Sequence, residues 1–124
     1  MKVAVFSAKP YDEQYLTAAG PDIAWHFLPQ ALTEDTVQCI ADCDAVCVFV
    51  NDVLNGPVLR LLHLAGIRII LLRCAGFNNV DLNTAKALGM QVARVPAYSP
   101  EAVAEHCVGM MLCLNRKLHK AYNR

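Results

Sequence analysis

The chain has 124 residues, enough for a single domain, and 56% of them are hydrophobic. Its 11 Lys and Arg residues balance its 11 Asp and Glu residues, which argues against binding to nucleic acid or to a membrane surface, because both need a basic surplus. No apolar run approaches the roughly 18–20 residues of a membrane span, and the apolar stretch after Lys2 is shorter than a signal peptide needs, so we expect a cytoplasmic protein.

The hydrophobic pattern alternates between strands and helices from the N-terminus onward. Strands are expected at 2–7, 23–28, 45–50, 68–73 and 91–95, and helices at 12–20, 33–42, 56–66 and 81–89. Strands separated by helices predict parallel βαβ units with right-handed crossovers. We therefore expect an α/β fold with a doubly wound, flavodoxin-like sheet of five parallel strands in the order 2-1-3-4-5.

Residues at the ends of these segments support the boundaries. Thr33 and Asp81 are expected to be N-caps, and Gly20 and Gly89 to end helices. Residues 45–50 carry no charge, which is typical of a strand buried on both faces.

The last segment, "SPEAVAEHCVGMMLCLNRKLHKAYNR" (99–124), predicts one helix of more than twenty residues, with Ser99 as N-cap and Pro100 at the first helical position. Between Ala102 and Leu114 it is apolar on nearly every face, and such a helix must be covered on all sides. A five-stranded domain that ends here cannot cover it. We therefore expect a connecting or interface helix, and a homo-oligomer formed through residues 100–122.

Six cysteines raise the question of a metal site or a disulfide. Cys39, Cys43 and Cys47 are evenly spaced, but the first lies in an expected helix and the last in an expected strand, so the three do not converge. No CxxC motif occurs. We expect buried free thiols and no metal site.

The stretch "CAGFNNVDL" (74–82) follows an aliphatic strand and breaks it abruptly. In doubly wound sheets, ligands lie outside the carboxyl ends of the strands, where this turn is expected. On its residues alone, it is either an ordinary turn or one that offers backbone N–H groups to a small anion. The motifs of other ligand sites are absent. Neither the dinucleotide-binding motif GxGxxG nor the phosphate-binding motif GxxxxGK[ST] occurs. The segment "FSAKP", after the first strand, has neither the acidic residues of a receiver domain nor the hydroxyl residues of a flavin-phosphate loop.

Residues 73–106, "RCAGFNNVDLNTAKALGMQVARVPAYSPEAVAEH", resemble the D-specific 2-hydroxyacid dehydrogenases, and among them most closely the fermentative NAD-dependent D-lactate dehydrogenases. The matching elements are "CAGFNNVDL", "VPAYSPEAVAEH" and "AVCVFVND", and the start "MKVAVFSAKPYD" extends the resemblance over the whole chain. The resemblance implies a flavodoxin-like substrate domain over 1–98. It also implies a crossover helix over 99–124 that leads to an NAD-binding Rossmann domain.

The resemblance also implies roles for particular residues. The amides of Ala75 and Gly76 would bind the substrate carboxylate, and Phe49 would pack near the small side chain of the substrate. Tyr98 would lie over the substrate cleft, and Val103 would contact the nicotinamide of NAD. On pattern alone, Phe49 is equally a core residue and Tyr98 a hinge residue.

The family's substrate-binding arginine, its glutamate and its proton-donating histidine have no counterpart in this sequence, nor has its glycine-rich fingerprint. We therefore assign no catalytic residue here. We expect NADH to reduce pyruvate to D-lactate in the intact enzyme and the 124-residue chain to be inactive alone. Two alternatives stay open: another family member acting on hydroxypyruvate, glycerate or a bulkier keto acid, and a free-standing interaction module that docks through helix 100–122.

Overall fold

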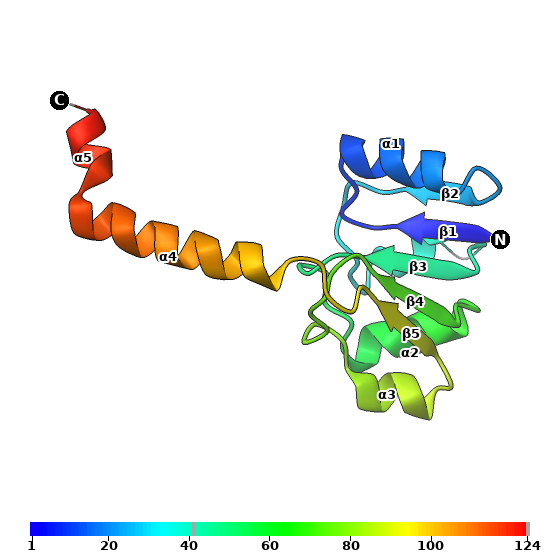
Figure 1. Cartoon of the computed structure of the whole chain (residues 1–124). Coiled ribbons are helices and arrows are strands. Elements are labelled where there is room, and N and C mark those ends of the chain that lie inside the picture. Colours follow the sequence, from blue (N-terminus) through cyan, green and yellow to red (C-terminus); the bar gives the residue numbers. More distant parts are fainter. Residues whose placement is uncertain (41, 124) are drawn as a thin grey trace.

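Five parallel strands form one sheet in the computed structural model, which describes residues 1–40 and 42–123 (Figure 1). The sheet order is β2-β1-β3-β4-β5, as the alternating pattern predicts. Each strand is shorter than expected by one or two residues at one or both ends, because the hydrogen-bonded ladder stops before the aliphatic runs do. The bounds are β1 (Lys2–Val5), β2 (Ala24–Phe27), β3 (Ala45–Val48), β4 (Ile69–Leu72) and β5 (Gln91–Arg94).

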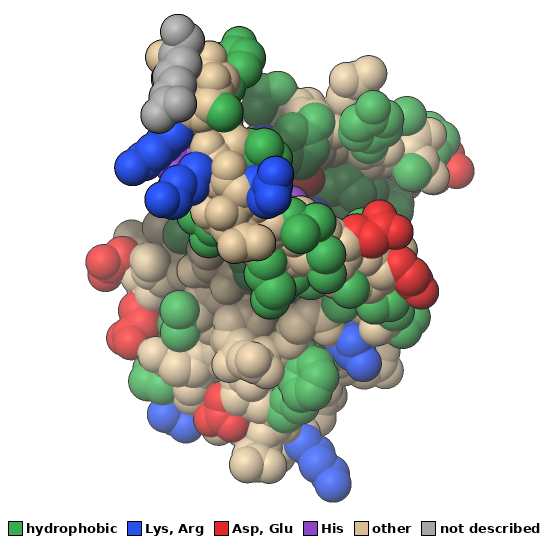
Figure 2. Space-filling view, turned by 60° about the vertical axis from the view of Figure 1, so that its left-hand side comes forward, with side chains coloured by type: hydrophobic (Ala, Val, Ile, Leu, Met, Phe, Trp, Pro, Cys, Tyr) green, Lys and Arg blue, Asp and Glu red, His purple; other side chains and the backbone are tan. Residues whose placement is uncertain are grey.

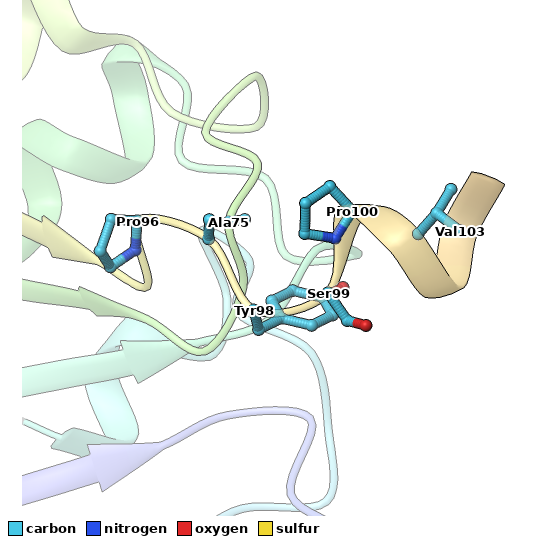
Figure 3. A pocket seen from close by; sticks show the side chains of 7 residues that line it. Ala75, Pro96, Tyr98, Ser99, Pro100 and Val103 are labelled. Atoms are coloured by element: carbon cyan, nitrogen blue, oxygen red, sulfur yellow. The ribbon is translucent and has the colours of Figure 1, made fainter. Parts of the chain in front are cut away.

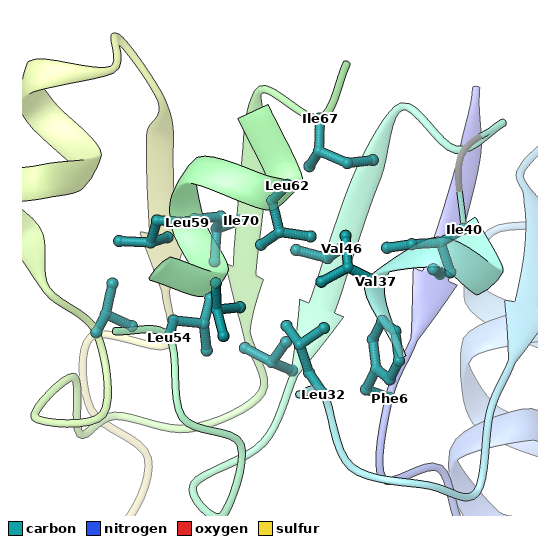
Figure 4. Close-up of a cluster of buried hydrophobic side chains, with 14 of the residues drawn as sticks. Phe6, Leu32, Val37, Ile40, Val46, Leu54, Leu59, Leu62, Ile67 and Ile70 are labelled. Atoms are coloured by element: carbon teal, nitrogen blue, oxygen red, sulfur yellow. The ribbon is translucent and has the colours of Figure 1, made fainter. Parts of the chain in front are cut away.

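Helices cover both faces of the sheet, which confirms the doubly wound α/β class. Helix α1 (Pro10–Ala19) packs on one face through Leu16. The other face carries α2 (Gly56–Leu64), α3 (Leu82–Ala87) and the short 3₁₀ helix η1 (Val37–Ile40), and holds the larger core (Figure 4). Strand β3 lies between these layers with all its residues buried, as its uncharged sequence predicts.

The helix boundaries follow the expected end signals at several points. The Asp81 side chain accepts a hydrogen bond from the Thr84 amide (3.0 Å) and so caps α3. Gly20 is the C-cap of α1. Gly89 follows α3 with φ +67°, a conformation that L side chains rarely adopt, so a glycine is needed there. Local sequence therefore determines where these helices stop.

The α-helix expected over 33–42 is wrong. The segment forms a turn and then only the 3₁₀ helix η1; Ala41, within the expected range, lies outside the described residues. The Thr36 hydroxyl contacts the carbonyls of Ala31 (3.1 Å) and Thr33 (3.2 Å), and the Thr33 amide donates to that hydroxyl (2.8 Å). These local side-chain bonds stabilise the turn around Thr36 and compete with a longer helix.

The C-terminal segment is not one continuous helix. It forms α4 (Pro100–Arg116) and α5 (Leu118–Tyr122), separated by Lys117 in the left-handed conformation (φ 55°). A left-handed residue cannot continue a right-handed helix, and it turns the chain. Ser99 is the N-cap as expected, although its side chain makes no capping hydrogen bond. Arg124 lies outside the described residues.

Helix α4 extends away from the sheet (Figure 1), and none of its residues is buried. Hydrophobic side chains gather along this part of the surface in Figure 2. The large apolar residues exposed on α4 are Val103, Val108, Met110, Met111, Leu112 and Leu114. No helix in the described part of the chain is both long enough and apolar enough to cross a membrane.

The six cysteines differ in burial: Cys113 is partly buried, and the other five are either buried or exposed. Cys43, Cys47 and Cys74 are buried free thiols, as expected. Cys39 and Cys107 are exposed, so for these two the expectation of buried thiols is wrong. Desolvation in the core raises the pKa of the Cys47 thiol, which keeps it in its neutral form.

Candidate functional site

The turn after β4 leaves two backbone amides without an acceptor. Its first residues are held in place, because the Arg73 amide donates to Val48 O (3.0 Å) and the Val95 amide to Cys74 O (3.2 Å). Among the hydrogen bonds of residues 1–40 and 42–123, none has the amide of Ala75 or Gly76 as its donor. Adjacent free N–H groups on a held turn form a compact site for an anion.

Steric crowding within the fold does not explain why residue 76 is a glycine. A Cβ atom built on it meets no other atom within 4 Å, and its φ is not positive. The fold itself therefore tolerates a side chain at this position. A side chain at this position would extend into open space beside the turn, so glycine leaves that space accessible.

An open pocket of about 200 Å³ lies between this turn and the start of α4 (Figure 3). It brings together three residues that the sequence singled out, Ala75, Tyr98 and Val103. Tyr98 is 74% exposed and Val103 is 66% exposed, so neither belongs to the core of the sheet domain. The remaining lining residues are Pro96, Ala97, Ser99 and Pro100.

Gly76 lines a second hollow of about 200 Å³. Val50, Asn78 and Asn79 complete its lining. The sequence reasoning did not select Val50 or Asn79. The signal that points to them is their place in the loops that follow β3 and β4, at the edge where parallel strands present their carboxyl ends.

Phe49 lies directly after β3 and is half-buried. It packs against the larger core cluster, and the guanidinium carbon of Arg73 is 5.6 Å from the centre of its ring. Phe49 lines neither of the two hollows. Phe49 therefore lies at the expected edge of the sheet. It also contributes to the core, which is the other role that the sequence pattern allowed.

The crevice between β1 and β3, where the strand order reverses, is occupied by the chain itself. The Ser7 hydroxyl donates to Oδ1 of Asp52 (2.8 Å). Both terminal nitrogens of Arg73 donate to the carbonyl of Phe6 (3.1 and 3.0 Å), and Nε of Arg73 lies 3.5 Å from Oδ1 of Asp12. Doubly wound folds commonly bind ligands at this crevice. The pocket that contains Ala75, Tyr98 and Val103 lies further along, near the ends of β4 and β5.

Neither hollow has the character of a metal or nucleotide-phosphate site. The described residues contain no group of three or more His, Cys, Asp or Glu side chains placed to hold a metal ion. The wall that Val103 and the two prolines form is apolar, so it fits a flat ring better than a charged phosphate. The arrangement suits a small carboxylate at the turn, next to an uncharged ring.

A family model, "D-isomer specific 2-hydroxyacid dehydrogenase, catalytic domain", matches residues 3–122. The chain belongs to this family. It is 53% identical to the D-lactate dehydrogenase of Escherichia coli over the whole of this chain and 38% of that protein. The chain therefore spans 38% of the length of this relative.

Solved structures of family members share the fold. The apo-structure of the Escherichia coli D-lactate dehydrogenase superposes with a TM-score of 0.83 at 53% identity, over 100% of this chain and 40% of that one. The Aquifex aeolicus D-lactate dehydrogenase, solved with NAD and lactic acid, superposes with a TM-score of 0.81 at 29% identity, over 98% of this chain and 36% of that one. The expected family and fold are thus confirmed.

Proposed function

We propose that residues 1–98 are the substrate domain of an NAD-dependent D-lactate dehydrogenase, and that residues 99–124 are the crossover to its nucleotide-binding domain. The family match and the 53% identity to the Escherichia coli enzyme support this proposal. The observation that carries it is the pair of free amides at Ala75 and Gly76, beside an open pocket on the carboxyl edge of the sheet.

A 2-keto acid such as pyruvate presents a planar carboxylate, and so does the product D-lactate. The amides of Ala75 and Gly76 are proposed to donate hydrogen bonds to that carboxylate. Because the turn is held through Cys74 and Arg73 before the ligand arrives, these donors need little reorganisation on binding. Two fixed donors also orient the keto carbon relative to the rest of the pocket.

Three side chains have proposed roles beside these amides. Tyr98 and Val103 line the pocket beside Ala75. Tyr98 is proposed to cover the substrate, and Val103 to pack on the nicotinamide ring of NAD, which supplies the hydride when it is bound. Phe49 lines neither hollow; it is proposed to limit the size of the substrate from its place at the end of β3. The sharp bend of the chain through residues 95–99 would serve as a hinge for domain closure, which excludes water from the reaction.

Residues 1–124 offer no candidate for the family's general acid or for its carboxylate-binding arginine. We therefore propose that these groups belong to sequence outside this segment. The expected consequence is that the 124-residue chain alone does not oxidise NADH in the presence of pyruvate. Activity that is clearly above a blank and that survives repurification would contradict this.

The proposal is tested with a hybrid in which residues 1–124 replace the matching segment of the Escherichia coli enzyme. We expect the hybrid to oxidise NADH with pyruvate and to prefer pyruvate to hydroxypyruvate and to bulkier keto acids. A hybrid that folds but prefers hydroxypyruvate would assign the chain to a different member of the family. A folded hybrid without any reductase activity would favour an interaction module instead.

Gly76→Ala in the same hybrid tests the anion site itself. Because a Cβ atom at Gly76 meets nothing within the fold, the variant should fold normally. Its methyl group would stand in front of the amides and raise the KM for pyruvate about tenfold or more, the effect of losing roughly 1.4 kcal/mol of binding. Gly109→Ala is the matched control, since Gly109 also has open space around it but lies on α4, outside the pocket. Equal KM values for the two variants would contradict the site.

We further propose that the protein is cytoplasmic and that copies of the chain associate through residues 100–122. The support for association is the row of exposed Val, Met and Leu side chains on α4, which the sheet domain leaves uncovered. Burying such a row removes apolar surface from water, and this is the main driving force for association of helices in solution.

A further inference from the structure

Asp52 is a fully buried carboxylate at the carboxyl edge of the sheet (0% exposed). It accepts three hydrogen bonds, one from each of three separate segments. The Ser7 hydroxyl (2.8 Å) and the Leu32 amide (2.9 Å) donate to Oδ1, and the Phe49 amide (2.7 Å) donates to Oδ2. The loops that follow β1, β2 and β3 are therefore joined at one side chain.

A fourth segment joins this cluster through Asn79. Its side-chain nitrogen donates to the backbone carbonyls of Asp52 (2.8 Å) and Phe49 (3.1 Å). In return, the Leu54 amide donates to the carbonyl of Asn79 (2.8 Å). Asn79 also lines the hollow in front of Gly76. The loop after β3 and the turn that carries the free amides are thus bonded to each other in both directions.

The donors around Asp52 require a carboxylate rather than an amide. An aspartate oxygen only accepts hydrogen bonds, and two of its three partners are backbone N–H groups that only donate. An asparagine has one accepting oxygen, so its NH₂ group must face the Phe49 amide or the Leu32 amide, donor against donor. In either orientation the buried cluster loses a bond and keeps an unsatisfied donor.

We infer that Asp52 is a positioning residue for the substrate site: it fixes Phe49 and, through Asn79, the turn at Ala75 and Gly76 relative to each other. This inference rests on the function proposed above. Asp52 touches neither hollow, so it acts only through these partners. If the distance between Phe49 and the carboxylate-binding amides limits the size of the keto acid, as proposed above, Asp52 sets substrate preference as well as affinity.

The structural half of this inference is tested in the 124-residue chain by NMR of Asp52→Asn. We expect faster hydrogen exchange at the amides of Leu32 or Phe49, together with chemical-shift changes at Ala75 and Gly76. Asp81→Asn is the matched control, because it removes a carboxylate from the same edge but keeps an N-cap side chain on α3. Changes in Asp52→Asn that stop at Ser7, Leu32 and Phe49 would overturn the inference.

The functional half is tested in the hybrid enzyme, at a temperature where circular dichroism shows each variant folded. We expect Asp52→Asn to raise the KM for pyruvate about tenfold, with a smaller change in kcat, and to narrow the preference for pyruvate over 2-ketobutyrate by a similar factor. Asp81→Asn should leave both quantities unchanged. A merely structural Asp52 would lower the unfolding temperature and leave KM and preference unchanged, and that result would overturn the inference. An inactive hybrid without substitutions would instead count against the proposed function. The NMR comparison of Asp52→Asn with Asp81→Asn would still show whether Asp52 positions the turn at Ala75 and Gly76.

Discussion

The guanidinium of Arg94 lies 5.2 Å from the centre of the Phe77 ring, over its face. The same side chain donates hydrogen bonds to the carbonyls of Ala75 (2.8 Å) and Pro96 (3.0 Å). Arg94 therefore ties the turn after β4 to the segment that leaves β5. These are the two pieces of chain between which the pocket opens.

Replacing Arg94 should disturb the pocket more than it disturbs the fold. Arg94→Ala removes two hydrogen bonds and one cation–π contact at an exposed site, so we expect a loss of about 1 kcal/mol in the free energy of unfolding, measured with urea. The freed turn should raise the KM of the hybrid enzyme for pyruvate.

Arg68→Ala is the control for this prediction. Arg68 also donates to two carbonyls, those of His63 (2.8 Å) and Ile67 (3.0 Å), but it precedes β4 and lies at the opposite end of the strand from the pocket. We expect a similar loss of stability with an unchanged KM. An equal rise in KM for both variants would mean that Arg94 acts only through general stability.

Shortening a leucine side chain on α2 should lower the free energy of unfolding only where that side chain is buried. Leu62 is fully buried (0% exposed) and belongs to the larger core cluster, whereas Leu64 on the same helix is 81% exposed. Leu62→Ala leaves a cavity and should cost about 2–5 kcal/mol of unfolding free energy, whereas Leu64→Ala should change it by less than about 0.5 kcal/mol. Chemical denaturation of the 124-residue chain measures both, and similar losses would contradict the helix orientation.

The N-cap of α3 should make stability depend on acid pH. The hydroxyl of Thr84 (2.6 Å) and its amide (3.0 Å) donate to the Asp81 carboxylate and hold its pKa below the ordinary value of 3.8. The unfolded chain then binds this proton more tightly than the folded chain. The stabilisation is therefore complete above the ordinary pKa and is lost as the pH falls through the lowered value.

Thr84→Val tests this, because the Thr84 hydroxyl is the largest cause of the lowered pKa. Unfolding free energies from about pH 6 to about pH 2 should fall less steeply in the variant than in the parent chain. Identical slopes would show that the hydroxyl bond does not contribute. Because the variant keeps the amide bond, a small residual dependence is expected.

The exposed apolar row on α4 should make the 124-residue chain self-associate. Met111→Lys places a charge in that row and should shift the chain toward monomer in sedimentation at high concentration. Glu105→Gln changes the net charge by the same amount on the same helix without removing apolar surface, and it should leave association unchanged. A monodisperse monomer of the parent chain at high concentration would contradict the proposed interface.

Local patterns were enough to predict the sheet. The uncharged run around Val46 and the helices between strands predict parallel pairing, and the right-handed crossover leaves few possible strand orders. The same local reasoning failed at 33–42 and at Lys117. In the first case, the hydroxyl of Thr36 donates to the carbonyls of Ala31 and Thr33 and so stabilises a turn. In the second, a single left-handed residue ends α4 within a sequence that carries no glycine or proline as a stop signal.

The sequence by itself determined the fold class, the family resemblance and the position of the turn at Ala75 and Gly76, because strands, caps and motifs are encoded by neighbouring residues. Only the tertiary structure decided that the crevice between β1 and β3 is filled by Ser7, Asp52 and Arg73. It also decided that Asp52 joins four loops. Those contacts bring together residues up to 67 positions apart in the chain, and no local pattern specifies which distant polar groups will satisfy one another once they are buried.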